Sequence, residues 1–461
     1  MSEDRHCEDT IAAIATPLGE GGIAVIRISG SDALAVADRA FVPLGRNASK
    51  PSEARSHTLH YGHVMRGGII VDEVLLAVMR APRTYTVEDV VEITCHGGLL
   101  TAKATLDTVL ANGARLAAPG EFTRRAFLNG RLDLAQAEAV ADLIQARTEL
   151  AMRAANEQLA GSLSRRVNQL RDQMLDLLAH VEAHIDFPDE DIAPDTHQTL
   201  KERMISGIRF MDDLLQTATE GRILRRGIRV AIIGRPNAGK SSLLNQLVGH
   251  DRAIVSAIPG TTRDTIEETA NIRGIPVVFV DTAGLREARD EIEAEGIRRS
   301  RKTLEMAEAV IHVFDASVDL SPADVRFLSE FSAVNRVFVR NKTDLEARLN
   351  LPAGLAGPVI DVSCVTGQGI ETVKDALKSL VWSGEIRAEM LEVMINSRHQ
   401  ETLHRARAAA DHALGSLREN RPLELVALDL RTSVNAIGEI VGKTATEDLL
   451  DRIFGQFCIG K

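Results

Sequence analysis

The chain has 461 residues, 44% of them hydrophobic and 26% charged, which predicts about three packed domains and argues against long disordered stretches. Its net charge of −11 argues against sequence-independent binding of nucleic acid, and its four cysteines, none in a C-x-x-C pair, argue against a zinc site or a disulfide framework. It has no run of about 18 uncharged apolar residues, and its N-terminus, MSEDRHCEDT, is charged, so we expect a cytoplasmic protein without a membrane segment.

Residues 1–125 alternate short apolar runs with glycine and proline, which predicts an α+β domain. The predicted strands lie in GIAVIRISG (22–30), IIVDEVLLAVM (69–79) and DVVEITCHGG (89–98), with one or two helices between them. Arg27 lies inside the first of these apolar runs, where a guanidinium group needs an anionic partner.

Apolar residues recur every three or four positions in residues 126–226 and again in 383–461, which predicts a helical domain in two parts. The first part is interrupted by the acidic loop FPDEDIAP (187–194). A cluster of arginines near its end is a candidate basic surface, although such a run is more often a solvated helix face. The cluster consists of Arg222, Arg225, Arg226 and Arg229.

Residues 227–382 change to a repeated strand–loop–helix pattern, so a nucleotide-binding domain is predicted between the two helical parts. The runs IRVAIIG, VVFVD, AVIHVFD and RVFVRNK are short, rich in β-branched residues and unalternating, as buried parallel strands are. The fold class predicted for the chain is multidomain α+β, with an inserted Ras-like α/β P-loop GTPase domain.

The segment GRPNAGKS (234–241) follows the first of these strands and precedes an apolar helix, and it matches the phosphate-binding pattern G-x-x-x-x-G-K-[ST]. Its glycines allow backbone N–H groups to turn toward the phosphates, assisted by the helix N-terminus. Lys240 is predicted to reach the β- and γ-phosphates, and Ser241 is predicted to ligate Mg²⁺.

Three downstream segments, in the order typical of GTPases, predict that the nucleotide is GTP. Asp281 in DTAG (281–284) can hold the Mg²⁺ shell, and Thr262 in GTTRD (260–264) can offer its hydroxyl and carbonyl to Mg²⁺ and the γ-phosphate. Asp344 in NKTD (341–344) can accept from N1–H and the 2-amino group of guanine, which adenine lacks. The residues predicted to contact GTP are Asn237, Ala238, Gly239, Lys240, Ser241, Ser242, Ser256, Ala257, Ile258, Pro259, Gly260, Thr261, Thr262, Asp281, Thr282, Ala283, Gly284, Asn341, Lys342, Asp344, Ser363 and Cys364.

Leu285 occupies the position where Ras-like GTPases carry the glutamine that orients the attacking water. The orienting group must therefore come from elsewhere, and the spacing alone does not choose among the acidic residues that follow, which are Glu287, Asp290, Glu291, Glu293 and Glu295. The charge that develops during hydrolysis also needs a cation besides Lys240 and Mg²⁺. Arg286, Arg263 and a monovalent cation held near Asn237 are the candidates.

Five segments together resemble the MnmE (TrmE) family of tRNA-modifying GTPases, over nearly the whole chain. They are GRPNAGKSSLLN, PGTTRDTIEE, DTAGLRE, EFTRRAFLNGRLDLAQAEAVADLI and the terminal FCIGK. Generic GTPases have neither the LDLAQAEA helix nor the FCIGK tail, so the resemblance is specific. It implies an N-terminal folate-binding and dimerisation domain, a discontinuous helical domain and an inserted G domain.

The resemblance also implies an activity and a set of partners. A homodimer would form a heterotetramer with the flavin-binding protein MnmG (GidA) and add an aminomethyl or carboxymethylaminomethyl group to C5 of the wobble uridine, position 34, of certain tRNAs. A tetrahydrofolate derivative, either 5-formyl or 5,10-methylene, would supply the one-carbon unit. The two G domains would associate when GTP and K⁺ bind, and this association would activate hydrolysis.

Several residue roles carry over from the family by motif. They are the K⁺ ligands Asn237, Ser256, Ile258 and Thr261, the Mg²⁺ ligands Ser241 and Thr262, the water-orienting Glu293, and the folate contacts Arg27, Glu92, Arg131 and Lys461. The predicted catalytic residues are Lys240, Arg286, Glu293 and Cys458. Arg27 suits the glutamate tail of folate, with a salt bridge as the alternative, and Arg131 is placed at a helix start. Cys458 is expected to face the folate, with simple anchoring of the tail as the alternative.

Two other classes of GTPase would share the nucleotide site. A ribosome-assembly GTPase would carry a basic RNA-binding segment after the G domain, whereas this chain is acidic and returns to helices there. A membrane-remodelling GTPase would need an amphipathic or apolar membrane segment, and none is visible in the sequence. The prediction is therefore an enzyme, a K⁺-activated GTPase that acts in tRNA modification without membrane contact.

Overall fold

The computed structural model describes residues 9–46, 48–186, 194–249, 268–280, 307–322, 324–325, 328, 335–382, 391 and 393–461. The chain forms two compact units. One comprises residues 1–141, 167–172 and 434–461, and the other comprises 142–166 and 173–433.

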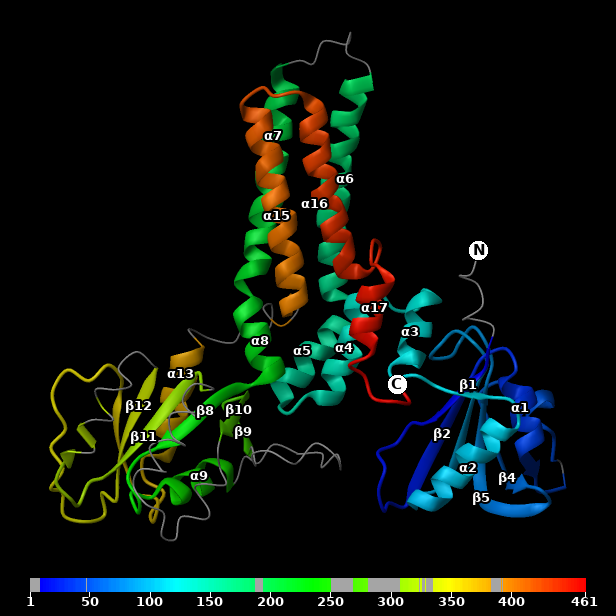
Figure 1. Ribbon diagram of the computed structural model, residues 1–461, viewed down its shortest axis with the longest axis horizontal. Helices are drawn as coiled ribbons and strands as arrows, with labels where there is room; N and C mark the ends of the chain where they lie inside the picture. The colour runs from blue at the N-terminus through cyan, green and yellow to red at the C-terminus, as the bar shows by residue number, and fades with distance from the viewer. Residues whose placement is uncertain are drawn as a thin grey trace. The chain divides into compact units, whose positions relative to one another are not determined.

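A seven-stranded sheet is the centre of the first unit, with its strands in the order β3-β4-β5-β6-β2-β1-β7 (Figure 1). The strands are β1 (Ile11–Ile14), β2 (Ile23–Ser29), β3 (Phe41–Pro43), β4 (Thr58–Arg66), β5 (Ile69–Met79), β6 (Val90–His96) and β7 (Arg115–Leu116). Helices α1 (Ala33–Ala40) and α2 (Leu99–Ala111) pack on the sheet, and a short 3-10 helix covers Pro51–Glu53. The strands predicted in 22–30, 69–79 and 89–98 are confirmed as β2, β5 and β6.

The alternation of side chains along β2 accommodates the arginine within an apolar run. Ile26 and Ile28 are fully buried in the core beneath α1 and α2, so Arg27 lies on the opposite face of the sheet. The antiparallel register places Arg27 directly across from Glu92 of β6. The strand is therefore half-buried, and its polar position faces a carboxylate.

The C-terminal end of the chain belongs to this first unit. Helix α17 (Glu447–Phe454) packs on α3 (Glu121–Leu128) and the start of α4 (Leu134–Gln145), and the rings of Phe127 and Phe454 lie 6.2 Å apart. The tail then passes close to β1, since a Cβ on Gly460 would lie 2.3 Å from the carbonyl oxygen of Ile14. Only glycine fits this approach, and its φ of +96° is unfavourable for other residues.

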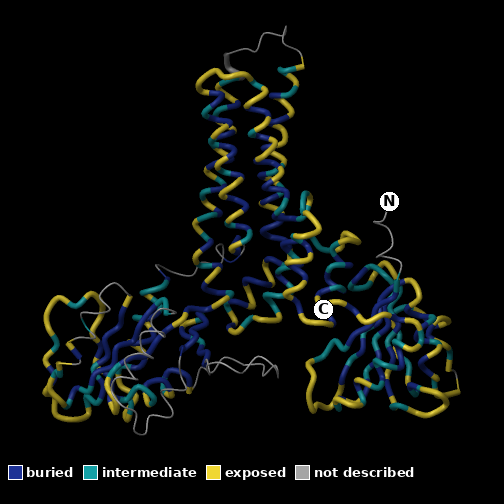
Figure 2. Tube along the Cα trace, viewed as in Figure 1, coloured by how far each residue is buried: buried dark blue, intermediate teal, exposed yellow. Residues whose placement is uncertain are grey.

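Long helices form one part of the second unit, and their facing sides are buried while their outer sides are exposed (Figure 2). They are α5 (Glu149–Leu159), α6 (Ser162–Asp186), α7 (Pro194–Gln216), α8 (Ala218–Arg226), α15 (Ser397–Arg418) and α16 (Leu423–Val441), of which α6 and α16 contribute residues to both units. Arg407 of α15 pairs with Asp212 of α7 at 2.5 Å. None of the described helices combines the length and apolar composition that crossing a membrane requires.

The arginine cluster predicted near residue 226 has acidic partners. Arg222 pairs with Glu308, and Arg225 pairs with Asp142. This arrangement agrees with the alternative of an ordinary helix face. The domain boundaries at 125/126, 226/227 and 382/383 stay a prediction, although α3 crosses the first of them.

The rest of the second unit is a six-stranded sheet in the order β13-β12-β11-β8-β10-β9, with helices α9 (Lys240–Gly249) and α13 (Ile370–Val381). The strands are β8 (Ile228–Ile233), β9 (Glu268–Ile272), β10 (Ile275–Val280), β11 (Ala309–Asp315), β12 (Arg336–Asn341) and β13 (Val359–Val362). All pairs are parallel except β9 with β10. Because β8 lies between β10 and β11, the strand order reverses beside it, and a ligand crevice is expected beyond its carboxyl end. The predicted inserted α/β domain is confirmed.

Candidate functional site

The phosphate-binding loop follows β8 and is shaped by two glycines in backbone conformations that other residues rarely adopt. A Cβ on Gly234 would lie 2.2 Å from the carbonyl oxygen of Val313 in β11. A Cβ on Gly239 would lie 2.0 Å from Nδ2 of Asn341 in β12. Between them, the exposed Asn237 has a φ of +63°. The loop is therefore clamped against the carboxyl ends of two neighbouring strands.

Lys240 begins α9 and folds back over the loop. Its Nζ donates to the carbonyls of Gly234 at 2.9 Å and Arg235 at 2.8 Å. Burial lowers the pKa of Lys240, since the ammonium group has lost much of its hydration. An anion placed at the mouth of the loop would compensate that loss, and the N-terminus of α9 adds favourable dipoles there.

Asn341 connects the phosphate loop to the loops that follow β12 and β13. Its side chain is 2% exposed; Nδ2 donates to the carbonyl of Ala238 at 2.9 Å, and Oδ1 accepts from the backbone N–H of Cys364 at 3.2 Å. One amide thus fixes the spacing between the predicted phosphate end and the predicted base end of the site.

The carboxylate of Asp344 is exposed beside these loops and is held by a serine. Ser363 is 1% exposed, and its Oγ donates to Oδ1 of Asp344 at 2.7 Å. Burial, followed by the charge of Asp344, raises the pKa of the Cys364 thiol to about 11, so this cysteine is a neutral thiol near pH 7. Lys342 pairs with Asp315 at the end of β11, at 2.5 Å.

The structure thus brings together Asn237 to Ser242, Asn341, Lys342, Asp344, Ser363 and Cys364 at one edge of the sheet. The other predicted GTP, metal and catalytic residues of this domain lie outside the described residues. They are Ser256, Ala257, Ile258, Pro259, Gly260, Thr261, Thr262, Asp281, Thr282, Ala283, Gly284, Arg286 and Glu293.

The four predicted folate residues lie in the first unit, around Tyr85. Arg27 is 17% exposed on its side chain, and its Nε donates to Glu92 at 2.8 Å, so the salt-bridge alternative is present. The guanidinium carbons of Arg27 and Arg131 lie 5.7 Å and 4.8 Å from the centroid of the Tyr85 ring. The C-terminal tail joins them, because Nη1 of Arg27 donates to the carbonyl of Gly460 at 3.4 Å.

Lys461 completes this group. Burial lowers the pKa of its side chain, and the nearby positive charge of Arg27 lowers that pKa further. Because neighbouring positive charges repel one another, this group of cations is a reasonable place for an anionic ligand. Cys458 is exposed in the same tail, and its carbonyl accepts from the backbone N–H of Lys461 at 3.3 Å.

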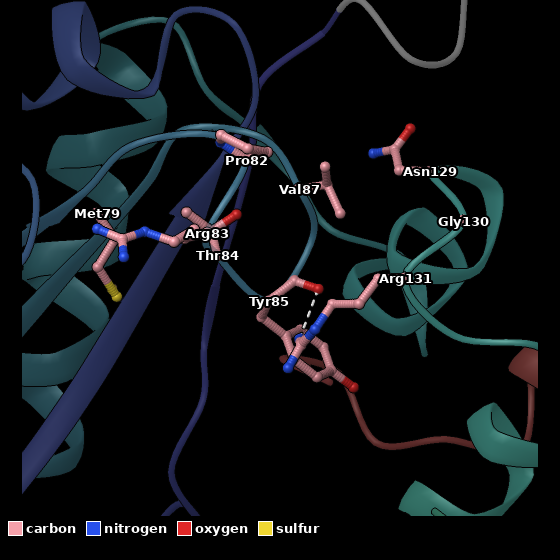
Figure 3. Close-up of a pocket in the computed structure, with 9 residues that line it drawn as sticks. All are labelled: Met79, Pro82, Arg83, Thr84, Tyr85, Val87, Asn129, Gly130 and Arg131. Atoms are coloured by element: carbon pink, nitrogen blue, oxygen red, sulfur yellow. Dashed lines mark hydrogen bonds between the residues drawn. The ribbon is translucent and has the colours of Figure 1, made fainter. Parts of the chain in front are cut away.

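An open pocket of about 630 Å³ adjoins Tyr85 (Figure 3). Arg131 contributes to its wall, donating from Nη1 to the carbonyl of Tyr85 at 2.8 Å. The prediction that Arg131 begins a helix is wrong, because α3 ends at Leu128 and α4 begins at Leu134. Its side chain is held by an aromatic ring and a carbonyl, and no helix dipole is involved.

Tyr85 is not among the residues that the sequence motifs predict for a site. A weak signal was present, since the chain has only two tyrosines and this one lies in a polar segment between predicted strands. The bridging role of Asn341 was also missed, as the motif predicted only a contact with GTP.

Comparison with known proteins agrees with this arrangement. Residues 10–131 match the family described as the N-terminus of the GTP-binding protein TrmE, and residues 134–458 match the MnmE helical domain. The tRNA modification GTPase MnmE of Bacillus velezensis is 46% identical over 98% of this chain and 100% of its own length. The proteins of the same name from Listeria innocua and Bacillus subtilis are 47% and 45% identical, each over 98% of this chain and at least 99% of their own length. The chain belongs to the MnmE family of tRNA modification GTPases.

Proposed function

We propose that this GTPase selects guanine through Asp344 and binds its phosphates through the loop 234–241. The observation that carries the proposal is the bridge made by Asn341, which ties the two ends of the crevice into one rigid frame. A carboxylate that accepts from N1–H and the 2-amino group of guanine would be left without these donors by adenine. The Ser363 hydroxyl supports the required orientation of Asp344.

Mg²⁺ fits the start of α9, where Ser241 offers a hydroxyl next to Lys240. The chemistry that Mg²⁺ supplies when bound is neutralisation of charge on the β- and γ-phosphates. Thr262 and Asp281 are the proposed partners of Ser241 in this role. Lys240, which is half-buried, would transfer its hydrogen bonds from the loop carbonyls to phosphate oxygens.

K⁺ fits beside Asn237, an exposed residue of the phosphate loop whose side chain carries an amide oxygen. The charge that K⁺ supplies when bound would take the place of an arginine finger, together with the proposed ligands Ser256, Ile258 and Thr261. Glu293 is proposed to orient the attacking water, and Arg286 remains a second candidate cation. Association of two G domains is proposed to complete this arrangement.

The cation requirement is tested by measuring GTP hydrolysis in KCl and in NaCl. The wild type should be faster in KCl, and Asn237→Ala should lose that difference while retaining GDP affinity. Ser379→Ala, which removes an exposed hydroxyl of α13 outside the predicted nucleotide contacts, is the matched control and should retain the potassium effect. Equal rates in both salts for the wild type would exclude the cation mechanism and leave nucleotide binding intact.

We also propose that the group around Tyr85 binds a tetrahydrofolate. Pterin presents a 2-amino-4-oxopyrimidine edge like that of guanine, and Glu92 is a carboxylate of the kind that accepts from such an edge. The surrounding Arg27, Arg131 and Lys461 fit the negative charge of the glutamate portion. Cys458, exposed in the adjoining tail, is the proposed participant in one-carbon transfer.

Calorimetric titration with 5-formyltetrahydrofolate tests this site. Arg27→Ala and Glu92→Gln should each weaken binding by about tenfold or more, since each removes one member of a partly buried pair. Arg55→Ala, which removes an exposed arginine of the same domain, should bind like the wild type. Wild-type affinity in the Arg27 variant would refute the assignment.

With these two sites, the chain is proposed to act as a homodimer with the flavoprotein MnmG, adding an aminomethyl or carboxymethylaminomethyl group to C5 of uridine 34. The support is the family membership, together with the two ligand sites proposed above for this chain. The test is nucleoside analysis of tRNA from cells in which Cys458→Ser or Asn237→Ala is the only copy of this protein. Full modification in both variants would contradict the proposed roles.

A further inference from the structure

The pocket beside Tyr85 carries more positive charge than recognition of a single carboxylate requires. Arg83 and Arg131 both contribute to its wall, and its lining contains no aspartate or glutamate. Figure 3 shows Arg131 over the Tyr85 ring, while Arg83 extends from the same loop toward Met79. Within the described part of the chain, Arg83 makes no hydrogen bond or ion pair, so its charge is available to a ligand.

The wall of this pocket is held in shape by its own hydrogen bonds. Asn129 donates from Nδ2 to the carbonyl of Thr86 at 2.7 Å, and the Thr84 hydroxyl donates to the carbonyl of Glu88 at 2.7 Å. Between these anchors Val87 has a φ of +67°, an unfavourable conformation for a β-branched residue. Strained backbone that the surroundings enforce is typical of ligand sites. The pocket is therefore preformed, and a ligand need not open it.

The pocket and the proposed folate group share the ring of Tyr85. Arg27 and Arg131 both lie within 6 Å of the Tyr85 centroid, at 5.7 Å and 4.8 Å. Arg27 belongs to the pair with Glu92 and the C-terminal tail, whereas Arg131 belongs to the pocket wall. The cationic pocket therefore borders the proposed folate group at Tyr85, within reach of a flexible chain that extends from a ligand bound near Glu92.

We propose that this pocket binds the oligo-γ-glutamate chain of a polyglutamylated tetrahydrofolate, with Arg131 and Arg83 pairing with successive α-carboxylates. The proposal rests on the proposed folate site and extends it to the form of folate that is preferred. A γ-linked glutamate chain has a free α-carboxylate on each residue. Separated arginines along an open surface suit such a chain better than a single arginine that binds one carboxylate. Arg83 is then a specificity residue that a monoglutamate does not need.

The test compares the affinities of 5-formyltetrahydrofolate monoglutamate and triglutamate for the full-length protein by calorimetry. The wild type should bind the triglutamate about two- to fivefold more tightly, as expected for the one exposed ion pair that Arg83 adds. Arg83→Ala should lose most of this preference and bind the monoglutamate like the wild type. Arg66→Ala, which removes an exposed arginine outside the pocket, is the matched control and should retain the preference. Raising NaCl from about 50 mM to about 500 mM should shrink the preference in the wild type.

The outcomes separate this proposal from the folate site itself. If the wild type binds both forms equally, the tail pocket is refuted while the folate site stands. If Arg83→Ala weakens both forms by the same factor, Arg83 contacts the ring portion and the tail assignment is wrong. If neither form binds to the wild type, the folate site and the tail pocket both fail.

Discussion

Replacing Asn341 with alanine should damage both nucleotide binding and stability, because this side chain joins the two ends of the crevice. The change leaves the carbonyl of Ala238 and the N–H of Cys364 without their side-chain partner. A buried polar group that loses its partner costs about 1–3 kcal/mol, so the two together cost roughly 2–6 kcal/mol. If the loops stay in place, this cost lowers the free energy of unfolding. If the loops instead relax so that these groups bind water, GDP binding must restore the original loop positions. A restoring cost of even about 2 kcal/mol weakens GDP binding roughly 30-fold.

Two measurements detect the two outcomes. Titration with fluorescent GDP gives the affinity, and urea unfolding followed by Trp382 fluorescence gives the stability, because this tryptophan is the chain's only one and is buried in the core around the six-stranded sheet. Arg340→Ala is the matched control, since the neighbouring Arg340 forms a surface pair with Asp361 and its loss should cost less than about 1 kcal/mol. If Asn341→Ala matches this control in both measurements, the bridging role is refuted.

Three further predictions concern the surrounding framework. Burial lowers the pKa of His312 to about 3, so the stability that this residue contributes is present above its unfolded pKa of about 6.5 and is lost as the pH falls toward 3. The unfolding constant should rise by at most about tenfold per pH unit in this range. In His312→Phe, the unfolding midpoint measured by Trp382 fluorescence should depend less on pH between about pH 6.5 and 5. Val87→Gly should raise the free energy of unfolding of the N-terminal domain by about 1 kcal/mol in calorimetry, since glycine removes the strain at φ +67°, and a lower value would show that the valine contacts outweigh it. Arg147 donates to the hydroxyl of Thr269 in β9 at 2.7 Å, so Arg147→Ala should speed hydrogen exchange of the backbone amides in residues 268–272. The double variant Arg147→Ala/Thr269→Val should exchange no faster than Arg147→Ala alone. Additive effects would mean that the two side chains act separately.

The nucleotide site could be predicted from sequence because its chemistry is carried by short continuous motifs. The loop 234–241 needs its glycines and lysine at fixed spacing, and the strand before it is an unbroken apolar run. The described parts of the site follow the parallel strands β8, β12 and β13, so the topology brings them to one edge of the sheet. Sequence therefore indicated which residues meet.

The site around Tyr85 could not be predicted in the same way, because no continuous segment carries it. Arg27 comes from β2, Arg131 from the turn after α3, and Gly460 from the end of the chain. These residues meet only through long-range packing, and the resemblance to a family was needed to group any of them. Side-chain alternation was the usable signal for Arg27, since its neighbours Ile26 and Ile28 are apolar and period two predicts that it faces away from them.

The two proposed sites would recognise their ligands by the same physical means. Guanine and pterin present the same kind of donor edge, and each proposed reader is a carboxylate, Asp344 in one case and Glu92 in the other. In both, a group from a different segment holds one carboxylate oxygen, the Ser363 hydroxyl at 2.7 Å and Nε of Arg27 at 2.8 Å. A carboxylate oriented in this way loses little conformational freedom when the ligand arrives, so less of the interaction energy is consumed in ordering it. The difference lies in charge: a neutral hydroxyl leaves the full negative charge of Asp344 for the base, whereas a guanidinium compensates Glu92 and adds a cation that suits a ligand carrying carboxylates.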